Sequence, residues 1–386
     1  MSSAFEFATA TRVVFGAGKA SLLSDWLGEL GVTRVLAVSG KDTRRAQAVW
    51  SSLELRGIFY ERLVVEGEPS VELVRAGTKA CVALGAEAVI AVGGGSAIDA
   101  GKAIAALAPG GADPLDHLEV VGRGLPLGAP PLPFAALPTT AGTGAEVTRN
   151  AVLSSAEHGV KASLRSPLML PRLAIVDPDF LIGAPRHVLT ASGLDALSQL
   201  IEPFVSVRAN PLSDALAREG LVRSRRSLEH AVLHGANARE RDDLALASLF
   251  GGLCLANAGL GAVHGFAAPL GGMFEAPHGA VCAALLPHVM RVNLRALYAA
   301  GAQTQVARYR ELAQLLTDDR EAEAEAGVLW VERLCRALEV PGLSAYGLRP
   351  EHIPALVAKA AVASSMRGNS VVLDASSLTE IAHSAL

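Results

Sequence analysis

The sequence has no large excess of charge of either sign and no long uninterrupted apolar run. Its 386 residues contain 34 Lys and Arg against 38 Asp and Glu, a formal net charge of -4. Without a sustained positive field, we expect no nucleic-acid partner and no anionic membrane surface. Hydrophobic residues make up 51% of the chain, yet no apolar stretch approaches the roughly 20 residues of a membrane-spanning helix. The N-terminus has no basic leader before an apolar stretch, so we expect a soluble protein in the cytoplasm.

Cysteine is also scarce. The four cysteines, Cys81, Cys254, Cys282 and Cys335, lie far apart in apolar contexts, and no two of them form a CxxC pair. This pattern favours buried reduced thiols over disulfides or a thiolate metal site. The sequence thus predicts neither disulfide bonds nor a metal site built from several cysteines.

The composition and the hydrophobic periodicity of the chain change along its length. In its first half, short apolar runs alternate with amphipathic stretches, which is typical of βαβ units and a parallel sheet. Strands are predicted at 34–39, 88–92, 134–137 and 173–176, and helices at 43–56, 71–84 and 97–107. From about Pro185 the chain is rich in Ala, Leu, Arg and Glu, and helical periodicity predominates. We therefore predict an α/β domain over residues 1–185 and an all-helical domain over residues 186–386.

Three consecutive glycines, followed by Ser96, come directly after the predicted strand 88–92 and open the next helix. In this position, backbone N–H groups and the helix dipole favour a phosphate. A capping box of Ser96 and Asp99 would explain both side chains without any ligand. Because three glycines exceed what a cap needs, phosphate binding is the favoured interpretation.

A second loop of small and hydroxyl-bearing residues, 138–148, follows the predicted strand 134–137. Small residues permit a ligand to approach closely, but an ordinary Ser/Thr/Gly loop has the same composition. By itself this loop does not decide between the two.

A carboxylate and two imidazoles mark the helical half. Asp195 and Gln199 lie four residues apart in an Ala/Leu pattern, so both project from one helix face. His264 and His278 follow in a largely apolar segment. Together these donors form a plausible set for Zn or Fe(II). Each residue alone is more often a buried polar group whose hydrogen bonds are satisfied, so the metal hypothesis depends on their occurring together.

These segments together resemble the iron-containing, or group III, alcohol dehydrogenases. The matching motifs are GGGSAIDAGKAIA from Gly93, LPTTAGTGAEVT from Leu137, AIVDPDF from Ala174, ASGLDAL from Ala191, NAGLGAVHG from Asn257 and PHGAVCAALLPHVM from Pro277. They occur in the family's order over nearly the whole chain. Relatives include glycerol dehydrogenase, maleylacetate reductase and, more remotely, dehydroquinate synthase.

The resemblance implies a Rossmann-like α/β domain and an all-helical domain, as in the dehydroquinate synthase-like fold, with a nicotinamide cofactor and the substrate in the cleft between them. The residues implied to hold the pyrophosphate and the adjacent ribose are Gly94, Gly95, Ser96 and Asp99. Those implied to line the adenine and phosphate side are Thr139, Thr140, Thr143 and Thr148, with Phe180 near the adenine. Lys161, one of only six lysines in the chain, would lie near the nicotinamide ribose.

The position after the predicted strand 34–39 bears on which dinucleotide is used. An acidic residue there would accept the adenosine ribose hydroxyls and repel a 2′-phosphate, but this chain has Gly40. Lys41, Arg44 and Arg45 follow nearby. We therefore count Gly40 with the cofactor-binding residues and expect NADP(H) to be accepted at least comparably with NAD(H).

The family's metal ligands are one Asp and three His, and here the chain departs from them. Asp195, His264 and His278 match three positions, while Gln199 stands where the family has another histidine. Ala268 stands where the family usually has a histidine close to the nicotinamide. Because the Gln199 carbonyl is a weaker ligand than imidazole, we expect a divalent metal, Fe or Zn, to be held weakly, replaced by a harder ion, or absent.

The predicted function is an NAD(P)-dependent oxidoreductase that interconverts a small alcohol and an aldehyde or ketone, assisted by the metal as a Lewis acid. The expected catalytic residues are His264, His278 and Lys161. Three alternatives stay open. One is a metal-independent reductase similar to maleylacetate reductase, another is a lyase or cyclase similar to dehydroquinate synthase, and the third is a degenerate site that binds the cofactor without turnover. The apolar segment 12–16 is a candidate strand edge for a homodimer.

Overall fold

The structure is a computed structural model that describes residues 4–274 and 276–386. By its internal contacts the chain divides into two compact units. The α/β unit comprises Thr9–Thr140 and Gly144–Ala184. The helical unit comprises Pro185–Leu386 together with Ala141–Thr143 and the N-terminal residues up to Ala8. The predicted fold class, a parallel-sheet α/β part and an all-helical part, is confirmed.

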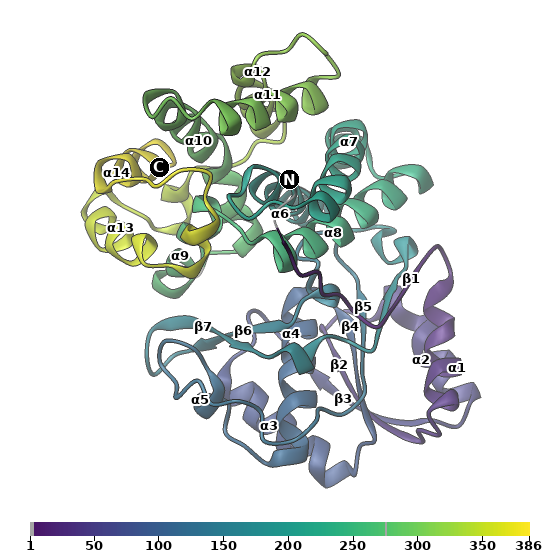
Figure 1. Ribbon diagram of the computed structural model, residues 1–386. Coiled ribbons are helices and arrows are strands. Elements are labelled where there is room, and N and C mark those ends of the chain that lie inside the picture. The colour runs from purple at the N-terminus through teal and green to yellow at the C-terminus, as the bar shows by residue number, and fades with distance from the viewer. Residues whose placement is uncertain (1–3, 275) are drawn as a thin grey trace. The chain divides into compact units, whose positions relative to one another are not determined.

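The α/β unit is built on a parallel sheet. Its strands are β1 (Arg12–Phe15), β2 (Arg34–Ser39), β3 (Phe59–Val64), β4 (Ala88–Gly93), β5 (Phe134–Pro138) and β8 (Leu173–Val176), in the spatial order β1-β8-β5-β4-β2-β3 (Figure 1). Strands β4 and β5 are buried along their whole length, which explains why both read as continuous apolar runs. Register pairs Ser39 with Val92 and Gly93 with Pro138. The carboxyl ends of β2, β4 and β5 therefore meet at one edge of the sheet.

Helices cover both faces of this sheet. They are α1 (Leu22–Glu29), α2 (Gln47–Leu55), α3 (Val71–Leu84), α4 (Gly95–Leu107) and the short α5 (Pro114–His117). Helices α1 and α2 share a core cluster with Val35 of β2, whereas α3 and α4 share the other with Leu36. Successive strand residues point to opposite faces, so one strand supplies both cores.

A two-stranded antiparallel hairpin, β6 (Asn150–Ser155) and β7 (Val160–Arg165), completes the α/β unit. Every second residue of β6 is buried. Its inward residues Ala151 and Leu153 join the core cluster that contains α4. The sequence patterns predicted neither this hairpin nor β3.

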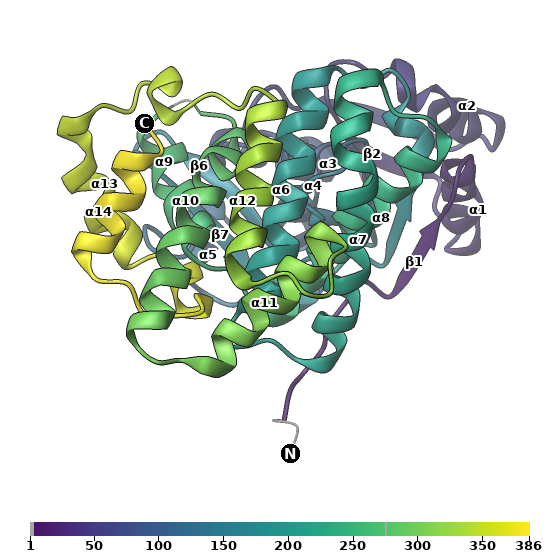
Figure 2. The same ribbon diagram turned by 90° about the horizontal axis from the view of Figure 1, so that it is seen from above.

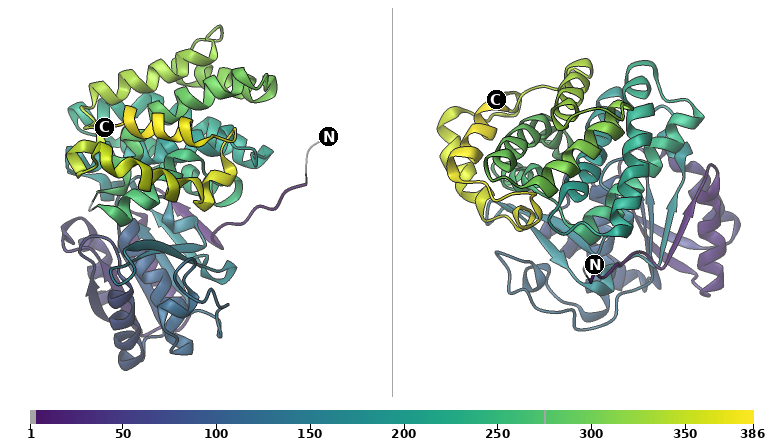
Figure 3. Two further views of the ribbon diagram at one scale, coloured as in Figure 1. Left: turned by 90° about the vertical axis from the view of Figure 1, so that its left-hand side faces the viewer. Right: turned by 45° about the horizontal axis from the view of Figure 1, so that its top comes forward.

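The helical unit is a bundle of longer helices. They are α6 (Arg186–Val205), α7 (Pro211–His234), α8 (Ala238–Ala258), α9 (Ala262–Met273), α10 (His278–Ala299), α11 (Gln303–Thr317), α12 (Ala324–Ala337), α13 (Ile353–Ala361) and α14 (Ala375–Ser384). Helix α6 contacts α7, α8, α10 and α11, and Figure 2 shows α6 running beside α7 and α8. The last two helices, α13 and α14, lie against each other at the C-terminal end of the chain (Figure 3).

Helix α10 is unusually apolar for its length. It is long and apolar enough to cross a membrane, as is the bent pair formed by α8 and α9. However, 72% of its apolar window is buried within the protein. Its composition is therefore that of a helix packed on several sides.

Candidate functional site

Three helices of the helical unit bring a group of donor side chains together. Asp195 lies on α6, His264 on α9, and His278 and Cys282 on α10. Their ligand atoms all lie within 4.8 Å of one another. The structure thus brings together three of the four metal ligands predicted from the sequence, and it adds a thiol.

Glycines allow these helices to approach closely. A Cβ at Gly279, directly after His278, would lie 2.4 Å from the carbonyl oxygen of Ala191 on α6. A Cβ at Gly261, just before α9, would lie 2.9 Å from Oε1 of Glu202. Both separations are shorter than van der Waals contact, so only glycine fits at these two positions. They hold α9 and α10 against α6.

The donor atoms of the group face one another at short distances. Asp195 Oδ1 lies 3.4 Å from His264 Nε2 and 3.7 Å from His278 Nε2. Cys282 Sγ lies 3.8 Å from His264 Nε2 and 3.7 Å from His278 Nε2. Asp195 is 1% exposed and His264 is 6% exposed, whereas the His278 side chain is 36% exposed. The group is therefore buried except on the side of His278.

Glu202 orients His264 within the group. Glu202 lies on α6, one turn after Gln199 and two turns after Asp195. Its Oε2 lies 2.6 Å from Nδ1 of His264, and its Oε1 accepts a 2.7 Å hydrogen bond from the backbone N–H of Val263. Nδ1 is engaged, so Nε2 is left to face Asp195 and Cys282. A carboxylate behind a histidine in this way is typical of metal sites, where it fixes the ring and raises its basicity. Sequence reasoning missed Glu202, although it lies at helical spacing from Asp195.

The charges of the group perturb one another. Burial raises the pKa of the Asp195 carboxyl, but the His278 and His264 imidazoles outweigh it and the pKa is lowered. The same imidazoles lower the pKa of the Cys282 thiol against the effect of burial. Cys282 in turn raises the pKa of His278 to about 9. Burial disfavours the charged form of His264, yet its negative partners hold its pKa well above the ordinary value. Opposite charges thus converge at one buried point.

One buried atom shows that a cation fits here. Among the residues that the structure describes, Asp195 Oδ1 has no hydrogen-bond partner although it is buried. An unsatisfied buried carboxylate oxygen is destabilising, and a divalent cation between Asp195, His264 and His278 would satisfy it. Carboxylate, imidazole and thiolate are all ligands of Zn and Fe. The donor set therefore fits a divalent metal.

Gln199 lies one turn after Asp195 on α6. Its side chain is buried and donates a hydrogen bond to the Asp195 carboxylate, which helps to lower the pKa of that group. Its Oε1 has no hydrogen-bond partner within residues 4–274 and 276–386. A Cβ at Gly251 of α8 would lie 3.7 Å from that oxygen. Ala268, the other departure from the family, is exposed on α9.

Cys282 is where the structure differs from the expectation about cysteines. All four cysteines are free and buried, as the spacing predicted. Cys282, however, follows His278 by one helical turn and belongs to the donor group. Sequence reasoning missed it because a lone cysteine in an apolar run is indistinguishable from a core residue. The signal that could have found it is its i,i+4 spacing from His278.

A second group of predicted residues gathers at the carboxyl ends of β2, β4 and β5. Helix α4 begins at Gly95, with Gly94 as its N-cap, and Ser96 lies in its first turn. Thr139 donates its backbone N–H to Gly93 at 2.9 Å, and a Cβ at Gly94 would lie 3.4 Å from Oγ1 of Thr140. Gly40 lies close to Gly93, whose Cβ would be 3.4 Å from the Gly40 nitrogen. No side chain caps this helix N-terminus, and backbone N–H groups at such a position favour an anion.

Asp99 and Thr148 are held by a buried lysine that sequence reasoning missed. Lys102, 1% exposed, lies 3.4 Å from Asp99 and donates to Oγ1 of Thr148 at 2.8 Å and to the carbonyl of Asn150 at 2.6 Å. Asp99 also accepts a 2.9 Å hydrogen bond from the N–H of Val152. These two side chains thus fix α4 against the segment that leads into β6. The i,i+3 spacing of Asp99 and Lys102 was the available signal.

The remaining predicted residues are spread over both units. Lys161 lies on β7 with a side chain that is 10% exposed and forms a 3.2 Å ion pair with Glu68. Phe180 is buried in the core cluster of α1 and α2, and its carbonyl accepts a 2.8 Å hydrogen bond from Arg45. Thr143 groups with the helical unit by its contacts. The structure therefore gathers Gly40, the glycine loop and the Thr139–Thr140 pair. Arg45 connects Phe180 to this group, because its Nη1 also lies 3.5 Å from the Thr139 carbonyl.

The charged residues after β2 are largely engaged with one another. Arg44 donates to Asp42 at 2.8 and 3.0 Å and Lys41 lies 3.4 Å from Glu66. Asp42, two residues after Gly40, was overlooked in the prediction about NADP. Its pKa is held low by hydrogen bonds from Arg44, so it is anionic at neutral pH. The positive charge at this strand end is smaller than the sequence alone indicated.

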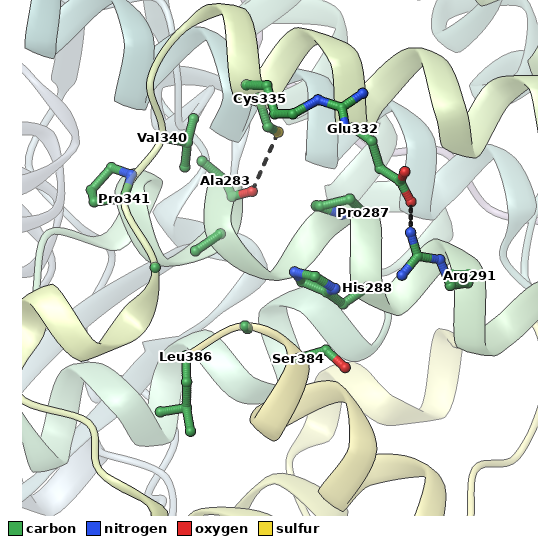
Figure 4. A pocket seen from close by; sticks show the side chains of 14 residues that line it. Ala283, Pro287, His288, Arg291, Glu332, Cys335, Val340, Pro341, Ser384 and Leu386 are labelled. Carbon is green, nitrogen blue, oxygen red and sulfur yellow. Dashed lines mark hydrogen bonds and ion pairs between the residues drawn. The ribbon is translucent and has the colours of Figure 1, made fainter.

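A cavity of about 320 Å³ in the helical unit is separate from these residues (Figure 4). It is lined by α10, α12 and the C-terminal residues, among them Pro287, Cys335 and Leu386. Arg291 and Glu332 form an ion pair at its wall. None of the site residues predicted from the sequence lines it.

Comparisons with known proteins agree along the whole chain. Residues 10–178 match the sequence profile described as "Iron-containing alcohol dehydrogenase", and residues 189–386 match that of "Fe-containing alcohol dehydrogenase family, C-terminal". The chain is 33% identical over 390 residues to lactaldehyde reductase of Escherichia coli (strain K12), covering 96% of this chain and 97% of that protein. It is 35% identical over 296 residues to 1,3-propanediol dehydrogenase of Klebsiella pneumoniae, covering 75% and 76%.

Solved structures give the same result. A crystal structure of a 1,3-propanediol oxidoreductase superposes with a TM-score of 0.91 at 30% sequence identity and covers 100% of both chains. An alcohol dehydrogenase from Oenococcus oeni superposes with a TM-score of 0.90 at 29% identity, covering 99% of this chain and 100% of that one.

Proposed function

This chain belongs to the iron-containing alcohol dehydrogenase family, and we propose that it transfers hydride between NAD(P) and a small alcohol, aldehyde or ketone with the help of a divalent metal. The observation that carries the proposal is the buried Asp195 carboxylate. Its Oδ1 has no hydrogen-bond partner among the described residues, while His264 and His278 converge on it. Without a metal, the partners of that oxygen would be the two imidazoles alone, at 3.4 and 3.7 Å. The relatives' names support short-chain diols and hydroxyaldehydes as the substrate class.

The two parts of the chain divide the work. We assign the dinucleotide to the α/β part, residues 1–185, and the metal and substrate to the helical part, residues 186–386. The glycine loop at Gly94–Ser96, with Gly40, Thr139 and Thr140, supplies backbone and hydroxyl groups for the cofactor. Asp99 and Thr148 keep α4 in position through Lys102. Asp195, His264 and His278 hold the metal.

The side chains prepare the site for hydride transfer. When bound, the metal polarises the oxygen of the substrate and the nicotinamide accepts or donates the hydride. Glu202 holds the ring of His264 so that Nε2 points at the donor group. Burial of Asp195 and His264 excludes water and strengthens the local electrostatics. His278 is the exposed member of the group, so substrate approaches from its side.

Removing the unsatisfied carboxylate tests the proposal. Asp195→Asn should lower the metal content of purified protein and the rate of alcohol oxidation, read as nicotinamide absorbance, by at least about 10²-fold, since the donor set loses an anionic ligand. Asp243→Asn is the matched control, because Asp243 is equally buried but its carboxylate is satisfied by Arg223, Arg226 and Ser227. That control should lose stability and keep its metal. Full activity of a metal-free Asp195→Asn enzyme would support the reductase without metal instead.

Two further assignments complete the proposal. The outer edge of β1 is unpaired within the described sheet, and Val13 on it is 39% exposed. We propose that this edge pairs with a second copy to form a homodimer. The near-neutral charge and the free cysteines support a reducing, cytoplasmic location.

A further inference from the structure

We infer that Cys282, and not Gln199, supplies the fourth protein ligand of the metal, and that the resulting Asp-His-His-Cys set selects zinc. The inference rests on the proposed function for the presence of a metal, and it goes beyond that function by assigning the ligand and the ion. It replaces the expectation that Gln199 completes the set. The thiol at position 282 then compensates for the imidazole that the chain lacks at position 199.

The distances between the donor atoms are close to those of a tetrahedral zinc site. Bond lengths of about 2.0–2.1 Å to nitrogen or oxygen and about 2.3 Å to sulfur place the donors of a tetrahedral zinc ion roughly 3.3–3.6 Å apart. Four of the donor pairs are separated by 3.4 to 3.8 Å: Asp195 to each histidine, and Cys282 to each histidine. All the ligand atoms lie within 4.8 Å of one another. Cys282 Sγ is thus where a fourth ligand of a zinc ion belongs.

The backbone of α10 places His278 and Cys282 together. His278 and Cys282 are four residues apart near the start of α10, so both side chains lie on one face of the helix. Gly279 brings this turn of α10 against Ala191 on α6. Since backbone contact fixes the approach of α10 to Asp195, a rigid element places both of its donors.

Gln199 is oriented toward the Asp195 carboxylate through its amide nitrogen. Its amide donates a hydrogen bond to Asp195, and its Oε1 lies beside Gly251 of α8, 3.7 Å from where a Cβ would be. The amide nitrogen is thus engaged by the carboxylate, and the one donor atom that remains, Oε1, is on the side of α8. Gln199 therefore acts as a positioning residue that orients Asp195, as Glu202 orients His264.

The charge and the ligand types of the donor group favour zinc. A carboxylate and a thiolate together neutralise a divalent cation through groups that bind it directly. With Asp195 and neutral donors only, the second negative charge would come from Glu202, which lies behind the His264 ring and does not touch the ion. On metal binding the Cys282 thiol releases its proton to solvent. Soft thiolate ligands favour zinc, and zinc accepts a fifth donor when catalysis requires one.

The first test is spectroscopic and begins with the wild-type protein. Metal-depleted wild-type protein is loaded with Co²⁺, which reports thiolate ligation by a sulfur-to-cobalt charge-transfer band in the near ultraviolet. We expect the band in the wild type and in Cys254→Ser, a matched control at another buried cysteine of the helical unit. We expect it to be absent in Cys282→Ser and retained in Gln199→Ala. Bound cobalt without the band in the wild type, or the band persisting in Cys282→Ser, overturns the inference.

The second test measures zinc affinity by competition with a chromogenic chelator. Cys282→Ser should weaken binding by more than about 10²-fold, and Gln199→Ala by about tenfold as the loss of a supporting hydrogen bond. Combining Cys282→Ser with Gln199→His should restore zinc binding without the cobalt band and lower the preference for Zn²⁺ over Fe²⁺. Equal affinity of Cys282→Ser and wild type contradicts the inference, as does a larger loss in Gln199→Ala.

These readouts separate the ligand assignment from the proposed function. The cobalt band without any hydride transfer to aldehydes would sink the proposed activity and leave Cys282 a ligand. Hydride transfer by a metal-loaded enzyme without the band would keep the activity and refute the ligand. Failure of the wild type to bind zinc or cobalt at all would refute the inference together with the metal in the proposed function.

Discussion

At the scale of single residues, burial makes one carboxylic acid of the α/β unit sensitive to pH. Glu146 is 1% exposed, its Oε2 has no hydrogen-bond partner in the described part of the chain, and burial raises its pKa to about 7. Because the folded-state pKa lies above the unfolded value, the neutral form stabilises the fold. This stability is complete below about pH 4.5 and is lost as pH rises through 7.

Glu146→Gln should therefore remove this pH dependence. Relative to wild type, the variant should gain roughly 1–3 kcal/mol in free energy of unfolding between pH 4.5 and pH 8, because the amide carries no charge to bury. Denaturant unfolding at a series of pH values measures this, with the exposed Glu61→Gln as control. A constant difference between Glu146→Gln and wild type across that pH range would show that Glu146 is ionised in the fold.

The residues found from the sequence and those missed differ in their physical signal. Asp195, His264 and His278 were found because a polar side chain in an apolar helix needs a partner. Lys102 was missed since a lysine in a helix usually reaches solvent, and only the fold shows it buried among carbonyl groups. Cys282 was missed because thiols are themselves common in cores. The contact of α10 with α6 that gives Cys282 a role is tertiary.

At the scale of elements, strands buried on both faces were the predictable ones. β4 and β5 carry continuous apolar runs, and such runs are typical of the centre of a parallel sheet. β3 and β7 mix charged and apolar residues, FYERLV and VKASLR, so their assignment depends on pairing with β2 and β6. No local pattern shows such pairing.

The end of β2 gives a prediction about the dinucleotide. A Cβ at Gly40 meets no atom within 4 Å in the described structure, so Gly40→Asp introduces a carboxylate without steric strain. It should shift the ratio of kcat/KM for NAD(H) over NADP(H) upward by at least about tenfold, as the carboxylate accepts ribose hydroxyls and repels a 2′-phosphate. Gly40→Asn, which adds a side chain of the same size without the charge, is the control. An unchanged ratio in Gly40→Asp would show that the ribose lies elsewhere.

At the scale of the whole molecule, local sequence patterns predict only part of which residues belong to each unit. The texture change near Pro185 is plain in the sequence, whereas residues 141–143 and those up to Ala8 group with the helical unit through tertiary contacts. Asn257 on α8 shows how: its side chain accepts from the backbone N–H of Ala8 at 2.6 Å and donates to the Ala8 carbonyl at 2.9 Å. A hydrogen bond spanning 249 residues leaves no periodic pattern to read.

Because every donor of the metal group lies in the helical unit, metal binding should stabilise that unit selectively. At a metal concentration of 100 times Kd, binding contributes about 2.7 kcal/mol to the metal-bound unit. Hydrogen–deuterium exchange should accordingly slow by up to roughly 10²-fold in α6, α9 and the start of α10 on adding zinc to depleted protein. Exchange in β4 and β5 should stay unchanged, and Asp195→Asn should show no zinc effect. Equal protection of both units would mean that they unfold as one cooperative body, with the metal coupled to the sheet.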